Sequence, residues 1–135
     1  MYTKKVQIEA RVLGDLAINH ILPIAIRYQN ELSENILRLK EIFSEQEFKE
    51  IASARIERIK EISYHISAIK LKVKEMVEER KKANQVDDTR GKAQLYSEKV
   101  FPYLDNIRYH IDKLELIVDN DIWPLPKYRE LLFTR

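Results

Sequence analysis

The sequence predicts an all-α fold: an elongated antiparallel bundle of three long helices, followed by a short helical tail at the C-terminus. Three observations predict it. Apolar residues recur at helical spacing in residues 3–43, 44–84 and 88–118. Only two of the 135 residues are glycine, and 34% are charged, which is typical of helical bundles. The length and the absence of a linker or repeat favour one helical domain over residues 1–135.

The middle helix, residues 44–84, is the element along which the other two are expected to lie. Its apolar positions are spaced alternately by three and four residues and form one stripe: Ile59, Ile62, Ile66, Ile69, Val73 and Met76. Ser44 and Glu47 predict a capping box at its start, and Phe43 with Phe48 a hydrophobic staple. The helix is expected to end at Asn84, giving a rod roughly 60 Å long.

The first helix, residues 3–43, is predicted to be kinked at Pro23. Its apolar positions are Leu13, Leu16, Ala17, Ile21, Ile24, Ala25, Tyr28, Leu32, Leu39 and Ile42. Proline lacks a donor and clashes with the preceding turn, so we expect a kink or a break over residues 19–23. Asn35 falls on the apolar stripe, where it either fixes the register from a buried position or sits at an edge bonded to water. A short turn near Phe43 and Ser44 predicts that the first two helices are antiparallel.

The third helix, residues 88–118, carries its own stripe and a second proline. The stripe contains Ala93, Tyr96, Val100, Tyr103, Ile107, Leu114 and Ile117, with Ile111 and Val118 beside it. Pro102 either kinks this helix or starts a new one, and we favour the kink. The tail, residues 122–135, is rich in apolar side chains and can form a short helix after Pro126. Such a surface is expected to dock, either on this bundle or on another chain.

Composition narrows the class of protein. The net charge of +2 comes from interleaved acids and bases, whereas a nucleic-acid-binding protein usually shows a concentrated basic patch. There is no cysteine, no apolar run long enough to span a membrane, and no apolar signal core after Met1. We therefore expect a cytoplasmic protein that binds neither nucleic acid nor membrane. Met1 is compatible with a natural or an introduced start.

Catalytic, cofactor-binding and metal-ligating residues are all predicted to be absent. Gly14 and Gly91 alone cannot build a phosphate-binding loop, and no Glu-x-x-His motif of a bundle di-metal site occurs. Glu61 and His65 stand four residues apart, which is compatible with a metal pair but favours a solvated helix pair.

The chain has three histidines, each a candidate functional residue. His65 flanks the middle stripe, and we interpret it as a surface residue rather than a phosphate acceptor. His110 lies on the third stripe and is predicted to be a satisfied core or boundary residue. His20 stands near Pro23 and could bond a carbonyl freed there.

Three stretches carry a resemblance to a known family. They are VLGDLAINHILPIAIRYQN at 12–30, VEERKKAN at 77–84 and IRYHIDKLELIVDNDIWPLPKYRELLF at 107–133. Together they resemble the C-terminal region of type III glutamine synthetases, the large form of Bacteroides-like bacteria. The resemblance implies a parent enzyme that joins ammonia to glutamate using ATP and Mg or Mn, assembled as a double-ring dodecamer. It also implies that the catalytic carboxylates lie upstream, so no family site residue is carried over to this chain.

The function expected from this resemblance is that of a non-catalytic C-terminal domain excised from a larger enzyme, with a packing or assembly role. Its partners would be the rest of the synthetase chain and neighbouring subunits. The alternative is a stand-alone helical interaction module or adaptor without enzymatic activity. A signalling bundle with His65 as phosphate acceptor is a third hypothesis.

Overall fold

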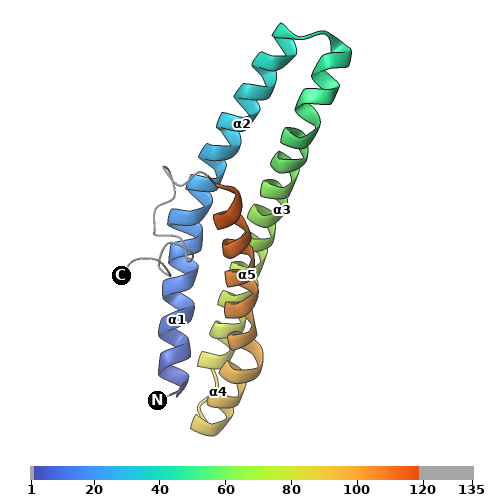
Figure 1. The fold of residues 1–135 in the computed structure, drawn as a ribbon. Helices are drawn as coiled ribbons and strands as arrows, with labels where there is room; N and C mark the ends of the chain where they lie inside the picture. The colour runs from blue at the N-terminus through green and yellow to red at the C-terminus, as the bar shows by residue number, and fades with distance from the viewer. Residues whose placement is uncertain (1, 119–135) are drawn as a thin grey trace, which may run out of the picture.

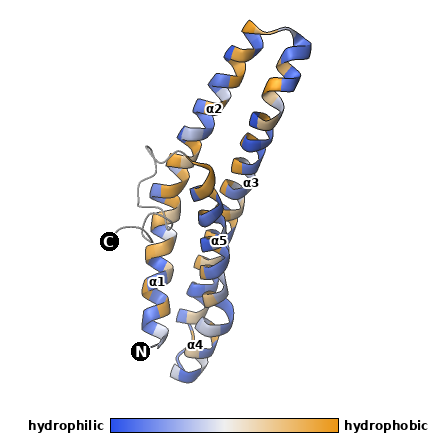
Figure 2. Cartoon of the chain, viewed as in Figure 1, coloured by the Kyte–Doolittle hydropathy of each residue, from blue (hydrophilic) through white to orange (hydrophobic). Residues whose placement is uncertain are grey.

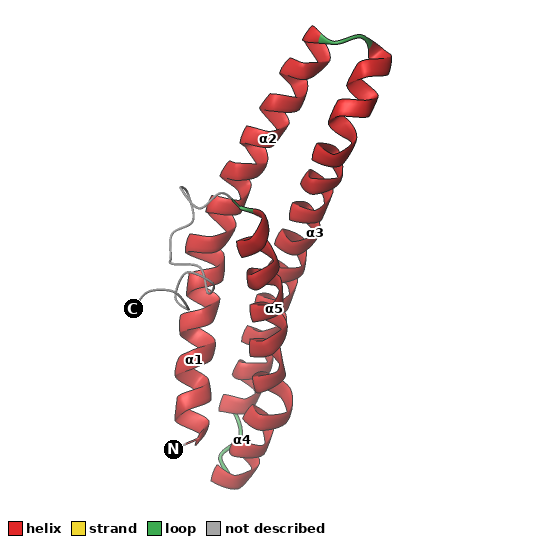
Figure 3. Ribbon diagram, in the orientation of Figure 1, coloured by secondary structure: helices red, strands yellow, loops and turns green. Residues whose placement is uncertain are grey.

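Three helical rods make up the part of the chain that the structure, a computed structural model, describes, namely residues 2–118 (Figure 3). The first rod joins α1 (Tyr2–Leu16), the π-helical turn η1 (Ala17–Ile21) and α2 (Leu22–Ile42); the second is α3 (Glu45–Asn84); the third joins α4 (Thr89–Leu95), the π-helical turn η2 (Tyr96–Val100) and α5 (Phe101–Ile117). The all-helical prediction and its three rods are thus confirmed. The tail predicted over residues 122–135 lies outside the described residues.

The start of α3 follows from its local sequence. The Ser44 hydroxyl accepts a hydrogen bond of 3.2 Å from the Glu47 backbone N–H, and the Glu47 carboxylate accepts one of 3.2 Å from the Ser44 backbone N–H. This reciprocal pair satisfies two N–H groups that a helix start otherwise leaves without partners. The hydrogen bonds from Ser44 also lower the pKa of Glu47 below its ordinary value. The predicted capping box and the predicted end at Asn84 are both confirmed.

A π-helical turn precedes each of the two internal prolines. The Leu22 N–H bonds the Ala17 carbonyl, and the Phe101 N–H bonds the Tyr96 carbonyl, so each bond spans five residues instead of four. In each case the proline, Pro23 or Pro102, comes two residues after the turn ends. The backbone stays helical through both prolines, so the break considered for residues 19–23 does not occur. The apolar periodicity of the sequence does not indicate the π turns.

The core lies where all three rods run together. α3 contacts both α2 and α5, and α1 contacts α5 and η2 (Figure 1). Hydrophobic and hydrophilic residues alternate along each rod (Figure 2). The main core cluster contains Val6, Ala10, Leu13, Ala17, Ile21, Leu22, Ala25, Ile62, Ile69, Val73, Met76, Ala83, Tyr96, Val100, Leu104, Ile107, Leu114 and Val118. Of the predicted stripe of the first helix, Leu16, Ile24, Tyr28 and Leu32 are partly buried and pack against this cluster. Ile42 and Asn35 are exposed, contrary to their predicted place on the stripe.

Beyond the end of α5, the second half of α2 and the first part of α3 continue as a pair (Figure 1). We call residues 33–42 and 45–59 the arm. No arm residue belongs to the main core cluster, and the arm's buried apolar side chains are Ile36 and Ala52. Its other facing apolar residues, such as Leu39 and Ile51, are only half-buried. Two helices cover each other less completely than three, so the arm keeps apolar surface in contact with solvent.

Candidate functional site: a histidine pair and an exposed arm

Two histidines from different rods meet inside the bundle. His65 of α3 is 5% exposed, and His110 of α5 is 7% exposed. Among residues 2–118, these two are the polar or charged residues that are buried. Their Nδ1 atoms are 2.8 Å apart. At this distance one ring donates its Nδ1 hydrogen and the other accepts it. The pair therefore satisfies two buried polar groups that would otherwise be costly to remove from water.

The prediction for His110 is confirmed, and that for His65 is wrong. His65 was expected on the surface, flanking the middle stripe, but it lies between Ile62 and Ile69 on the side of α3 that faces α5. A histidine at that position can be buried when the opposite helix supplies a hydrogen-bonding partner. The sequence of α3 alone does not show that His110 is that partner. His20, in contrast, is exposed, with its Nε2 atom 4.0 Å from the Asp15 carboxylate.

Two tyrosines flank the histidine pair. Each precedes one histidine in the sequence, as the dipeptides Tyr64-His65 and Tyr109-His110. The Tyr64 ring packs edge-on against both imidazoles, with centroid distances of 5.0 and 5.7 Å, and Tyr109 does the same at 6.5 and 5.1 Å. The Lys113 ammonium lies 5.4 Å from the Tyr109 ring centroid, within cation–π range. This cluster was not predicted, although the repeated Tyr-His dipeptide is a signal in the sequence that could have indicated it.

Burial lowers the pKa of both imidazoles and so favours their neutral forms. Desolvation is the main cause that lowers the pKa of His65; Glu61 opposes it and Lys113 reinforces it. Desolvation also lowers the pKa of His110, reinforced by His65 and by Lys72. Desolvation disfavours the charged form of a base, so both shifts have the expected direction.

The pair is a buried contact between α3 and α5. A phosphate acceptor must present a ring nitrogen to its donor, which a side chain only 5% exposed does not do. Glu61 acts on His65 through its charge. Among residues 2–118 no three His, Cys, Asp or Glu side chains are grouped to hold a metal ion.

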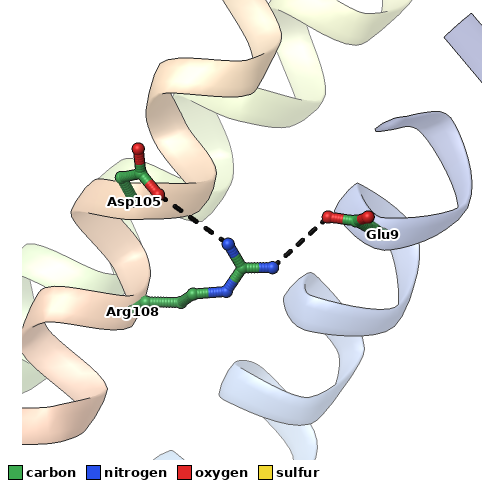
Figure 4. Close-up of polar contacts among 3 residues, drawn as sticks. All are labelled: Glu9, Asp105 and Arg108. Carbon is green, nitrogen blue, oxygen red and sulfur yellow. Dashed lines mark hydrogen bonds and ion pairs between the residues drawn. The ribbon is translucent and has the colours of Figure 1, made fainter. Parts of the chain in front are cut away.

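An ion pair joins the first and third rods on the surface (Figure 4). One Arg108 nitrogen lies 3.3 Å from a Glu9 carboxylate oxygen, and its other terminal nitrogen lies 3.8 Å from Asp105. Arg108 is thus held between a carboxylate on α1 and one on its own helix. The contact links residues 99 positions apart in the sequence and joins α5 to α1.

The arm carries the second candidate feature, an apolar surface without a cover among the described residues. Leu37 is 62% exposed and Ile42 is 71% exposed. At the base of the arm, a hollow of about 220 Å³ opens between α2 and α3, lined by Tyr28, Leu32, Ala54, Arg55 and Arg58. Exposed apolar surface is typical of a site that contacts another protein segment.

No helix among residues 2–118 is both long and apolar enough to cross a membrane.

Comparison with known proteins identifies the family. The family described as "Glutamine synthetase C-terminal domain" matches residues 1–40. A glutamine synthetase of Bacteroides fragilis (strain YCH46) is 61% identical over 134 residues, which is 99% of this chain and 18% of that protein. A type-3 glutamine synthetase of Dictyostelium discoideum is 24% identical over 135 residues, 100% of this chain and again 18% of the relative. The chain thus spans about a fifth of the length of these curated relatives, and it belongs to the glutamine synthetases, as their C-terminal domain.

Proposed function

We propose that this chain is the non-catalytic helical domain of a type III glutamine synthetase and serves in packing and assembly of the enzyme. The relative from Dictyostelium discoideum carries the name type-3, which supports the type. The parent reaction would be the ATP-dependent ligation of ammonia to glutamate in the cytoplasm, with ATP and Mg or Mn bound by the rest of the protein. The domain itself would bind no nucleic acid and no membrane.

The observation that carries the proposal is the arm. Its helices leave Leu37 and Ile42 largely exposed, whereas the residues of the main core are covered by a third rod. Covering apolar surface of this kind with another protein surface is favourable, because it removes that surface from water. The expected partner is the rest of the synthetase chain or a neighbouring subunit. We expect the assembly to be a dodecamer.

The bundle architecture suits such a role. We infer that its rods are antiparallel, since partners on neighbouring rods pair in opposite order: Gln29 with Ser63, His65 with His110, and Asn84 with Tyr96. We also infer that the first and third rods bend at Pro23 and Pro102, where the π turns place an extra residue. Three rods pack together at one end of the bundle, whereas the arm at the other end consists of α2 and α3 alone. The arm is therefore the end that we expect to contact the rest of the enzyme.

The test uses the full-length synthetase and two leucines of nearly equal exposure. Leu37 lies on the arm at 62% exposed, and Leu116 lies on α5 at 60%. We expect Leu37→Asp to shift the assembled enzyme toward smaller species in sedimentation velocity, because it places a charge in the proposed contact. Leu116→Asp serves as the matched control and should leave the assembly as in the parent.

Two results would contradict the proposal. An unchanged sedimentation profile for Leu37→Asp would remove the arm from the assembly contact. Glutamyl transfer by the purified 135-residue chain would show that the domain is catalytic after all.

A further inference from the structure

The hydrogen bond between His65 and His110 limits how many protons the pair can hold. In the neutral pair, one ring donates its Nδ1 hydrogen, and the other accepts at Nδ1 and carries its own hydrogen at Nε2. The donor ring then has a bare Nε2. A first added proton binds there, and the N–H···N bond remains. A second added proton has to bind the accepting Nδ1, which places two N–H groups against each other across 2.8 Å.

We propose that the histidine pair is an acid-sensitive contact that holds the second half of α5 on α3: it accepts one proton, and a second proton separates the two helices at this level. The proposal does not depend on the assembly role proposed above. It concerns the state of the domain itself, and it would hold for the chain alone or within a larger enzyme.

The surroundings offer little to stabilise a doubly charged pair. On α3, Glu61 is an acid whose charge reaches His65, while Lys72 on the same helix acts against charge on His110. On α5, Lys113 acts against charge on His65. The flanking Tyr64 and Tyr109 contribute aromatic rings packed edge-on against the imidazoles. The charged groups that act on the pair are thus one acid and two bases, so a second positive charge has no added carboxylate to meet.

The helix turns beside the pair would feel the separation. On α3 the pair lies between Ile62 and Ile69, and on α5 between Ile107 and Leu114, and these four residues belong to the main core cluster. Moving α5 away from α3 at this level would expose that apolar surface. Neither histidine belongs to the arm or to α1, so the change is expected first in the second half of α5.

The experiment follows both imidazoles by NMR in the 135-residue chain during a titration from about pH 8 to about pH 5, together with the amide signals of α5. The ¹⁵N shifts of an imidazole report which of its nitrogens carry hydrogen. We expect one ring to become charged while α5 signals stay unchanged. Charging of the second ring should coincide with a change in the amide signals of residues 107–117.

A stability measurement gives the size of the effect. A histidine that cannot take a proton in the folded chain but has its ordinary pKa when unfolded raises the unfolding constant about thirtyfold between about pH 7.5 and about pH 5. We expect the parent and the exposed-histidine variant His20→Gln to show this rise. The double variant His65→Leu/His110→Leu, which replaces both partners by apolar groups, should lack it.

Either of two outcomes overturns the proposal. One is that both rings carry two hydrogens each above about pH 5 while the amide signals of α5 are unchanged. The other is that the double variant loses stability with falling pH as steeply as the parent. Urea unfolding followed by circular dichroism supplies the second comparison, with His20→Gln as the control for loss of any histidine.

Discussion

The Tyr96 hydroxyl donates a hydrogen bond of 2.5 Å to the Oδ1 atom of Asn84, and so ties the π turn η2 to the last residue of α3. Tyr96 is the largest fully buried side chain among the described residues, and burial raises the pKa of its phenol. The phenol therefore stays protonated and remains a donor across the neutral range. We expect Tyr96→Phe to lower the free energy of unfolding by about 1 kcal/mol.

Urea unfolding of the 135-residue chain measures this change, and Tyr2→Phe is a suitable control, since Tyr2 is largely exposed on the first turn of α1. Equal stability of Tyr96→Phe and the parent would mean that water replaces the hydrogen bond without cost.

Gly14 is a helix-interior glycine with room for a side chain. A Cβ atom there would lie 3.7 Å from Met76 Cε and 3.7 Å from Val73 Cγ1, which is ordinary contact distance. Because alanine favours a helix over glycine, Gly14→Ala should raise the free energy of unfolding by about 1 kcal/mol. The melting temperature measures the gain.

Gly91 offers the matched comparison, because a Cβ there would lie 3.0 Å from Asp88 Oδ2 and 3.3 Å from Val86 Cγ1. Asp88 Oδ2 accepts the Gly91 N–H that caps α4, so it is not free to move. Gly91→Ala should therefore gain less than Gly14→Ala; a larger gain at Gly91 would refute this reading of both sites.

The capping box at the start of α3 should be measurable by a single deletion. Ser44→Ala removes the hydroxyl that accepts the Glu47 N–H, and we expect a loss of about 1 kcal/mol in the free energy of unfolding. Ser53→Ala, an exposed serine on the same helix, should change stability much less. If both variants melt alike, the cap contributes nothing in this context.

The same box should show in the pH dependence of stability. The folded state lowers the pKa of Glu47 below 4.5, so the unfolded chain binds its proton first as the pH falls. The contribution is present above about pH 4.5 and is lost as the pH falls through the lower folded value. The difference in stability between the parent and Ser44→Ala should accordingly shrink in acid, and a constant difference would contradict the assignment.

Arg108 should contribute little to stability, and that little should depend on salt. The Arg108 and Glu9 side chains are 46% and 33% exposed, so their ion pair is partly screened by water. We expect Arg108→Gln to cost under about 1 kcal/mol and to cost still less at high ionic strength. Arg38→Gln, which removes a pair within one helix, is the control.

The elements themselves were predictable from periodicity and capping. The stripe of α3 predicted its buried face, with Ile62, Ile69 and Met76 now in the core, because a long helix with no glycine or proline has few alternatives. The histidine pair was not predictable from either helix alone, since the partner that draws His65 inward lies 45 residues away. The exposure of Ile42 likewise depends on where the third rod stops.

The π turns were not predictable from periodicity. Buried residues follow one another at spacings of four at the second turn, as Tyr96, Val100 and Leu104. The same spacing occurs at His65, Ile69 and Val73 of α3, which is α-helical throughout, so it does not distinguish a π turn from an ordinary helix. What the two turns share in the sequence is a proline two residues after each of them.

The unbroken length of α3 has a mechanical consequence. It is one helix of 40 residues that begins at the tip of the arm and ends beside η2, and it touches the other helical elements along the way. Because α3 is continuous, a movement of the arm's tip would be transmitted along a single helix to the end beside η2.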